Sequence, residues 1–321
     1  LPTTTKITLG KAFSSVDGDA LMRSSKALLA ISRGEREQDY RDQLQYKELL
    51  SIDDMLPERI SNSAKRVNER VGNNIDKATS IREVLDTGLF NLPIYSLFSK
   101  TSIANPTDQT NPLRIISAQM RTTLIGPGGI SDANKVTGSA KEANPSQIGF
   151  LDPNQTPESA AAGVNLHLTL GVKKRGRTPF LVAYNMKTKK LEDVPATKLS
   201  EANVGFPDQY KWSEGKPTAL SKTIKVVGKK NKLQEVASKD VDYILPSAKR
   251  LFSVVSNAIP FLQNNHGARV EMANRHLEQA ISLVHREVPL VQVSLGGEGE
   301  DTVTFEKFIG ALSAHVAPVG G

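Results

Sequence analysis

Apolar residues recur at helical spacing in the segment that follows Ser51. Ile60, Ala64, Val67 and Val71 are four, three and four residues apart, which places them on one face of a helix. The opposite face carries the charged side chains Lys65, Arg66, Glu69 and Arg70. Asp53 and Asp54 are suited to cap the start of this helix, Pro57 is tolerated in its first turn, and Gly72 is expected to end it.

The pattern changes to a period of two further along the chain. From Val164 to Val172 apolar and polar residues alternate, which predicts a half-buried strand. The basic stretch Lys173 to Arg177 is interpreted as a turn, and Phe180 to Tyr184 as a second strand. The segment 164–186 is therefore predicted to be a hairpin.

Apolar spacing, caps and breakers predict further helices. Their expected ranges are 19–32, 81–85, a segment that begins near Pro93, 246–259 and 267–285. The last is expected to be capped by Asn264 and Asn265 and to contain an ion pair between Glu271 and Arg275. Residues 289–295 are expected to form a strand, so the fold class is α+β.

A polar turn and an apolar run at 108–125 end on Gly126-Pro127-Gly128-Gly129. Proline fixes its own φ and glycine admits positive φ, so these four residues predict a tight loop of defined conformation. Arg121 lies shortly before this loop. The following segment, 131–161, is polar and rich in turn residues, as functional or disordered loops are.

Composition narrows the function. The net charge is +7 and the pI about 9.4, which favours a polyanionic partner, nucleic acid first. Basic clusters at 187–190 and 229–232 add to this charge, although solvated loop residues explain each cluster alone. The chain has no cysteine, which excludes disulfides and thiolate metal sites. Neither a long apolar span nor an apolar leader is present, so we expect an intracellular protein with no membrane partner.

No complete catalytic apparatus is recognisable. The phosphate-binding loop, the nucleophile elbow and the Asp-x-Asp-x-Asp pattern are all missing, and the histidines lack zinc-binding spacing. Asp53 and Asp54 are better explained as helix caps than as Mg²⁺ ligands. We therefore expect no catalytic residue and no metal ligand in this chain.

The chain contains Asp-Gln-Thr-Asn-Pro-Leu at 108–113, Ile-Gly-Pro-Gly-Gly-Ile at 125–130, Gln-Thr-Pro-Glu at 155–158 and Ile-Pro-Phe-Leu at 259–262. In this collinear order the segments resemble the second-largest (beta) subunit of bacterial multisubunit DNA-directed RNA polymerase. The family has Asp-Gln-Asn-Asn-Pro-Leu and then Leu-Gly-Pro-Gly-Gly-Leu, where this chain has Asp-Gln-Thr-Asn-Pro-Leu at 108–113 and Ile-Gly-Pro-Gly-Gly-Ile at 125–130. The family's Glu-Thr-Pro-Glu-Gly-Pro-Asn is matched by Gln-Thr-Pro-Glu-Ser-Ala-Ala at 155–161. Its Ile-Pro-Phe-Leu is present at 259–262 and is followed by Arg269 and Met272. The resemblance covers most of residues 35–297.

The resemblance implies a division of labour between chains. In the family the catalytic Mg²⁺ is bound by the largest (beta-prime) subunit, so the cofactor would be Mg²⁺ held by a partner. The implied partners are a beta-prime-like chain, the remaining pieces of a beta subunit, template DNA, nascent RNA and nucleoside triphosphates. A short and divergent beta subunit resembles the split polymerases of giant bacteriophages, which implies the cytoplasm of an infected host or the virion as location.

The resemblance also implies roles for single residues. Arg269 matches an arginine that contacts the triphosphate of the incoming nucleotide, a task that suits a guanidinium; an ion pair with Asp240 or Glu271 is its structural alternative. The residues implied near the nascent RNA and template are Asp108, Gln109, Arg121 and Glu158. The loop of Gly126, Pro127, Gly128 and Gly129 corresponds to a fork loop, and Asp42 and Lys47 to a pocket for a flipped base of the non-template strand.

Departures from the family pattern are informative. Ala118 and Thr123 replace the family's rifamycin-contacting histidine and serine, so the assembled enzyme is expected to resist rifampicin. Ser-Ala-Ala at 159–161 replaces Gly-Pro-Asn, and Asn265-His266 replaces an acidic pair, which weakens the implied nucleic-acid contacts there.

The expected organisation is a beta-subunit fragment with mixed helical and antiparallel-strand lobes, not a self-contained single domain. The boundaries expected are 1–50 for the rest of an upstream lobe, 51–160 for the helical segment with the fork loop, 161–240 for a strand-rich insertion, 241–288 for a helical return to the active centre, and 289–321 for the start of a further β region. The alternative is a stand-alone, basic structural protein that binds nucleic acid and could be associated with a virion. A third hypothesis is a small metal-dependent enzyme. The lack of metal-ligating residues at suitable spacing argues against this hypothesis.

Overall fold

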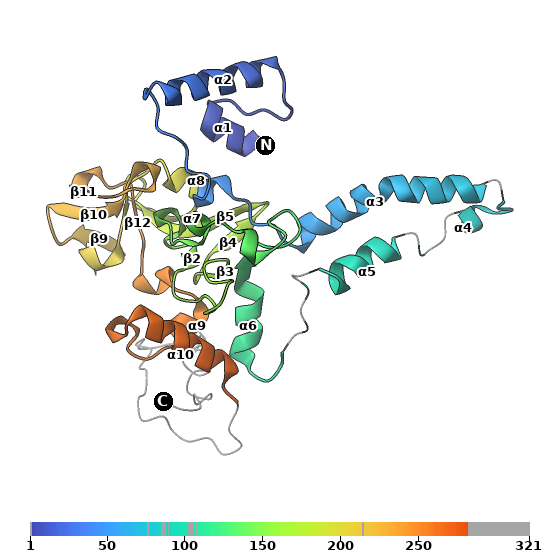
Figure 1. The fold of residues 1–321 in the computed structure, drawn as a ribbon. Helices are drawn as coiled ribbons and strands as arrows, with labels where there is room; N and C mark the ends of the chain where they lie inside the picture. Colours follow the sequence, from blue (N-terminus) through green and yellow to red (C-terminus); the bar gives the residue numbers. More distant parts are fainter. Residues whose placement is uncertain are drawn as a thin grey trace.

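A computed structural model describes residues 2–281 with the exception of 76, 85–87, 89, 102, 103, 105, 107 and 214. It combines helices with antiparallel and mixed sheets, so the predicted α+β class is confirmed. Figure 1 shows a central body of strands, a helical pair α1–α2 above it, and a long helical arm formed by α3 and α5.

The N-terminal third is helical. Its α-helices are α1 (Pro2–Leu9), α2 (Gly18–Ser32), α3 (Ile52–Ile75), α4 (Ile81–Val84) and α5 (Asn91–Ser99), with the 3₁₀ turn η1 at Leu44–Tyr46. The helix predicted at 19–32 and those predicted at 81–85 and near Pro93 are confirmed as α2, α4 and α5, as far as the described residues reach. Asp17 caps α2, since its side chain accepts a hydrogen bond from the Ala20 amide at 2.8 Å.

Two details of α3 differ from the prediction. The helix begins at Ile52, so Asp53 and Asp54 lie inside its first turn and neither is the N-cap residue. Asp54 nevertheless satisfies one amide at this helix start, because its carboxylate accepts a hydrogen bond from the Ser51 amide at 3.2 Å. It also continues through Gly72 to Ile75. An interior glycine costs a helix only about 1 kcal/mol relative to alanine, which a helix of this length tolerates.

The middle of the chain contributes short elements. They are α6 (Pro112–Met120), β1 (Arg121–Thr123), η2 (Ala133–Lys135), α7 (Gly138–Lys141), η3 (Pro145–Gln147), β2 (Leu151–Asp152) and β3 (Asn165–Leu168). The turn-rich segment 131–161 is therefore ordered by short helices and a strand. Strands β1, β3 and β2 form a three-stranded antiparallel sheet in that order.

The predicted hairpin at 164–186 is wrong. Strand β3 pairs with β1 and β2, while the hairpin partner of β5 is β4. Strand β4 is Lys173–Arg175, so most of the predicted basic turn is itself a strand. Charged side chains suit β4 because it lies at the edge of its sheet. The second predicted strand is confirmed as β5, Thr178–Asn185.

A mixed seven-stranded sheet forms the largest body. Its order is β11-β10-β7-β12-β5-β4, with β6 pairing β5; β12 and β7 are parallel and the other pairs antiparallel. The elements are β6 (Lys190–Pro195), α8 (Ala196–Leu199), β7 (Val204–Gly205), η4 (Pro207–Gln209), β10 (Thr223–Val227), η5 (Lys229–Asn231), β11 (Leu233–Ala237), η6 (Ser238–Asp240) and β12 (Tyr243–Ile244). Strands β8 (Tyr210–Ser213) and β9 (Lys216–Ala219) form a separate hairpin. Buried side chains such as Phe150, Leu181 and Val194 form the core under this sheet.

The C-terminal described segment returns to α6. It contains η7 (Ala248–Leu251), α9 (Val254–Asn257), η8 (Leu262–Asn264) and α10 (Gly267–Gln279). The single helix predicted at 246–259 is wrong, because Ser253 interrupts it and caps α9. Helix α10 ends at Gln279, before the predicted His285, and its cap is His266 instead of the two asparagines. The predicted strand at 289–295 lies outside the described residues.

Candidate functional site

Helices α6 and α10 lie beside the sheet β1-β3-β2 (Figure 1). Side chains from these elements line a cavity of about 340 Å³. Arg114, Ser117 and Ala118 of α6 form one wall, and Glu271, Asn274, Arg275 and Glu278 of α10 form another. The remaining wall comprises Arg121, the segment Gln155–Ser159, Asn165 and His167. Three arginines thus face three glutamates around one cavity.

Asn111 fixes the start of α6 against the end of α10. Its side-chain oxygen accepts a hydrogen bond from the Leu113 amide at 2.9 Å, which caps the helix, and Pro112 follows in the first turn. Its amide nitrogen donates to the carbonyl oxygens of Leu277 at 2.6 Å and Glu278 at 3.3 Å. Asn111 is only 1% exposed. One buried side chain therefore sets the spacing of the two helices that form the cavity.

The floor of the cavity is a buried hydrogen-bond network. The Gln155 amide nitrogen donates to Glu278 Oε1 at 2.6 Å and to Ser117 Oγ at 2.9 Å, and the Ser117 hydroxyl also donates to Glu278. The His167 Nδ1 lies 3.1 Å from the carbonyl oxygen of Gln155, and since a carbonyl only accepts, this nitrogen carries the proton. Burial lowers the pKa of His167, so the ring is neutral and positions the Gln155 segment.

A second network anchors α9 and was not anticipated from the sequence. Asp152 is fully buried, and its carboxylate accepts hydrogen bonds from the Ser253 amide at 2.7 Å and the Ser256 hydroxyl at 2.5 Å. Ser256 in turn contacts the Asn274 amide group at 3.0 Å. The only signal in the sequence is an aspartate that directly follows Phe150 and Leu151. This network holds α9 and α10 against β2.

Two of the four residues implied near RNA line this cavity. Glu158 lies 3.9 Å from the Arg275 guanidinium, so Arg275 pairs with Glu158 instead of the predicted Glu271. Arg121 is exposed at the start of β1. Burial, and then the nearby charge of Glu158, raises the pKa of Glu271. The structure thus brings Arg121 and Glu158 together with Arg275, which the sequence reasoning did not select.

The other three predicted contacts lie elsewhere. Asp108 is 3.1 Å from the Arg114 guanidinium and accepts a hydrogen bond from the Thr110 amide at 3.0 Å; the Thr110 side chain holds the pKa of Asp108 low. Gln109 is exposed. Arg269 is exposed in the first turn of α10, where its Nη1 lies 3.5 Å from the Met272 sulfur, and it does not line the cavity. An approaching ligand would have to reach Arg269 from outside this cavity.

The Gly-Pro-Gly-Gly loop lines a second, larger cavity of about 990 Å³. Its conformation is fixed by hydrogen bonds from the Gly129 amide to the Gly126 carbonyl at 2.9 Å and from the Gly126 amide to the Ile130 carbonyl at 3.1 Å. Gly128 has φ +78, and a Cβ on Gly129 would lie 2.5 Å from the Leu124 carbonyl oxygen. These positions therefore require glycine.

The two residues implied for the non-template strand share this second cavity. Asp42 and Lys47 line it together with Pro127, Gly128 and Gly129, and so does Arg121. The Lys47 ammonium is 3.8 Å from Asp42, and burial lowers the pKa of Lys47. Arg121 thus lies between the two cavities.

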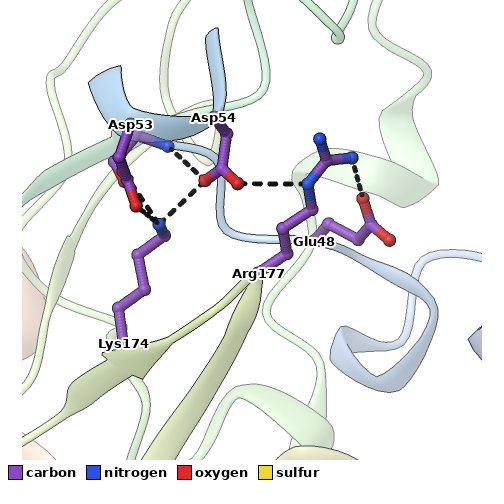
Figure 2. Close-up of polar contacts among 6 residues, drawn as sticks. Glu48, Asp53, Asp54, Lys174 and Arg177 are labelled. Carbon is purple, nitrogen blue, oxygen red and sulfur yellow. Dashed lines mark hydrogen bonds and ion pairs between the residues drawn. The ribbon is translucent and has the colours of Figure 1, made fainter. Parts of the chain in front are cut away.

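An ion-pair cluster, shown in Figure 2, joins the base of the helical arm to the β4–β5 hairpin. Lys174 lies 2.8 Å from Asp54 and 3.1 Å from Asp53, and Arg177 lies 3.1 Å from Asp54 and 3.3 Å from Glu48. The Lys174 ammonium holds the pKa of Asp54 low, and Ser51 and then Lys174 lower that of Asp53. The aspartates predicted as caps therefore anchor the arm.

The described residues limit the chemistry of the site. Among them, no group of three or more histidines and acidic residues is placed to hold a metal ion. No helix in the described ranges is long and apolar enough to cross a membrane. The described site thus combines paired charges, two cavities and a loop of fixed conformation.

Comparisons with known proteins relate part of this chain to one protein family. Residues 106–173 match the family model of RNA polymerase Rpb2, domain 3. The chain is similar to the DNA-directed RNA polymerase subunit beta of Phaeodactylum tricornutum, at 26% identity over 277 residues, which cover 84% of this chain and 19% of that protein. It is also similar to the subunit of the same name from Mycoplasmopsis synoviae, at 27% identity over 83% of this chain and 23% of that protein. The subunit from Thermotoga maritima is 26% identical over 81% of this chain and 21% of that protein.

The chain thus spans about a fifth of the length of these curated relatives. The family model covers α6, β1, the Gly-Pro-Gly-Gly loop, β2 and β3. Together the matches support a fragment of an RNA polymerase beta subunit, as the sequence motifs predicted.

Proposed function

We propose that this chain is a subunit of a DNA-dependent RNA polymerase that lines the active centre and is inactive alone. The observation that carries this proposal is the position of the matched segment. Residues 106–173 supply the Gly-Pro-Gly-Gly loop of the larger cavity and Glu158 of the smaller one. They also supply Arg121, which lines both cavities. The segment that matches the family model therefore also contributes to both cavities.

The proposed division of chemistry follows the resemblance to the beta subunit. In that family a beta-prime chain binds the Mg²⁺ ion, so a beta-prime-like partner would supply the ion that stabilises charge during nucleotidyl transfer. This chain would contribute cations and shape. Arg121, between the cavities, would face nascent RNA or template, and Arg269 would approach the triphosphate of the incoming nucleotide.

The loop and its neighbours suit the edge of a melted duplex. Gly128 and Gly129 hold a conformation that other residues cannot adopt without displacement, so the loop would act as a rigid wedge. Asp42 and Lys47 line the same cavity and would accept a displaced base of the non-template strand. Their charged groups provide both an acceptor and a donor for a base edge.

Affinity purification of the tagged chain from its source cells tests the proposal. We expect it to co-purify with beta-prime-like and further beta-type chains, and the complex to synthesise RNA on a DNA template. A chain that binds nucleic acid but recovers no such partners would favour the alternative, a stand-alone structural nucleic-acid-binding protein, which the net charge of +7 also suits. A giant-bacteriophage source, with the enzyme in the infected host or virion, belongs to the same proposal and is tested by the identity of the recovered partners.

A further inference from the structure

Helix α3 carries a stripe of arginines along one side. Arg59, Arg66 and Arg70 are seven and four residues apart, which places them within about 40° of one another around the helix axis. With a rise of 1.5 Å per residue, the stripe extends for roughly 16 Å. Asn62 and Ser63 fill the turn between the first two arginines.

These side chains line a groove between α3 and α5 with a volume of about 900 Å³. On the α5 side the groove is lined by Leu92, Pro93, Ser96 and Leu97. At one end it reaches Pro127 and Gly128 of the Gly-Pro-Gly-Gly loop. The groove therefore connects the helical arm, which projects from the body in Figure 1, with the larger of the two cavities, which is lined by the same loop residues.

Two of the three arginines in this groove have no carboxylate partner among the described residues. In the part of the chain that the structure describes, neither Arg59 nor Arg66 forms an ion pair with a carboxylate, whereas Arg175 and Arg177 on the β4–β5 hairpin do. Lys65 adds a fourth cation, against the two carboxylates Glu58 and Glu69. A concave surface with a surplus of guanidinium groups attracts polyanions, and guanidinium binds phosphate through two parallel hydrogen bonds.

We propose that the groove between α3 and α5 binds the sugar–phosphate backbone of a nucleic-acid strand, independently of its sequence, and leads it past the Gly-Pro-Gly-Gly loop. The stripe is long enough to contact several successive phosphates, which are about 3.4 Å apart along the axis of each strand in a duplex. The Asn62 side chain adds an amide donor beside the arginines. The hydroxyl groups of Ser63 and Ser96 donate to the carbonyl oxygens of Arg59 and Pro93, at 2.9 Å each. The assignment of this strand to transcription rests on the proposed function, but the binding itself does not.

Fluorescence anisotropy on the full 321-residue chain tests this groove. The probe is a labelled 20-nucleotide oligo-dT, titrated between 50 and 300 mM KCl, with duplex DNA and single-stranded RNA of equal length as further arms. For the combined variant Arg59→Gln, Arg66→Gln and Arg70→Gln we expect at least about a tenfold loss of affinity. The slope of log K against log salt should shrink by about 2, since each lost phosphate contact on a single strand contributes roughly 0.7.

The matched control removes the same charge elsewhere. Lys211, Lys216 and Lys222 are exposed on the strands β8, β9 and the turn before β10, so their combined change to glutamine should leave the slope unchanged. Arg66→Lys should retain most of the slope, because the charge remains. Unchanged melting by circular dichroism shows that the variants fold.

Three results would overturn the inference. One is an equal loss of affinity in the lysine control, and another is an unchanged salt slope in the arginine variant. The third is tighter binding of a poly-glutamate peptide than of any nucleic-acid probe, which would indicate an acidic polypeptide as the occupant. If the purified complex makes RNA but the arginine variant binds the oligonucleotide normally, only the proposal for the groove is refuted. If binding depends on the arginines but no polymerase partners are recovered, only the proposed function is refuted.

Discussion

Replacing Asn111 with alanine should separate α6 from α10 at a predictable cost. The change removes the helix cap to the Leu113 amide, and loss of such a cap costs about 1 kcal/mol. It also leaves the carbonyl of Leu277 without its 2.6 Å donor, in a site where Asn111 is 1% exposed. A buried acceptor without a partner costs about 1–3 kcal/mol, so the total is about 3 kcal/mol.

Hydrogen exchange measured by mass spectrometry locates this loss. Because 1.4 kcal/mol corresponds to a factor of ten, peptides from α6 and from the end of α10 should exchange roughly a hundredfold faster, while those from β10 and β11 should not change. The melting temperature should fall by about 6–12 °C, at 2–4 °C per kcal/mol. Asn111→Ser is the control: a serine hydroxyl can cap the helix but is too short to reach Leu277, so about 1 kcal/mol should return. Unaltered exchange in α10, or equal losses in the two variants, would refute the reasoning.

Four further outcomes are expected. Gly129→Ala should disorder the loop and abolish open-complex formation by the assembled enzyme, because its Cβ would lie 2.5 Å from a backbone oxygen, whereas Gly138→Ala, which meets no atom within 4 Å, should be neutral. The lowered pKa values of Asp53 and Asp54 mean that their pairing contributes fully above the unfolded pKa near 3.8 and is lost as the pH falls through the folded values. Amide exchange at the start of α3 should therefore rise selectively on acidification, and Lys174→Gln should reduce this pH dependence, since Ser51 and Arg177 still lower the two pKa values. Arg269→Ala should raise the KM for nucleotides with the complex still assembled, and an unchanged KM would contradict its assignment. The assembled polymerase should resist rifampicin, and inhibition at ordinary bacterial doses would show that the two replaced contacts do not matter.

The sequence predicted strands and helices better than it predicted their partners. The alternation at 164–172 identified a half-buried strand, but a period of two does not state which strand lies beside it. Strand β3 pairs with Arg121–Thr123, more than forty residues earlier in the chain, and this pairing left no local signal. The basic stretch 173–177 predicts a turn, but its first three residues form the edge strand β4, where charged side chains remain in contact with solvent.

Charged pairs distant in sequence were equally invisible. Asp54 and Lys174 are 120 residues apart, so nothing near Asp54 distinguished an ion-pair partner from a helix cap. The helix itself was predictable because its apolar stripe is local. Local sequence patterns therefore predict the helix of the arm, but they do not predict the ion pairs in Figure 2 that attach it to the hairpin.

Helical geometry explains why Arg269, which the motif resemblance selects, does not line the cavity between α6 and α10. Glu271, Asn274, Arg275 and Glu278 are three or four residues apart and form the face of α10 that lines the cavity. Arg269 precedes Arg275 by six residues, which rotates it about 240° around the helix, away from that face. Arg275 therefore acts inside the cavity beside Glu158, and a triphosphate that contacts Arg269 must bind on a different side of α10. The nucleotide site proposed for Arg269 would therefore lie on a surface outside this cavity, and the change Arg269→Ala is to be measured in the assembled enzyme.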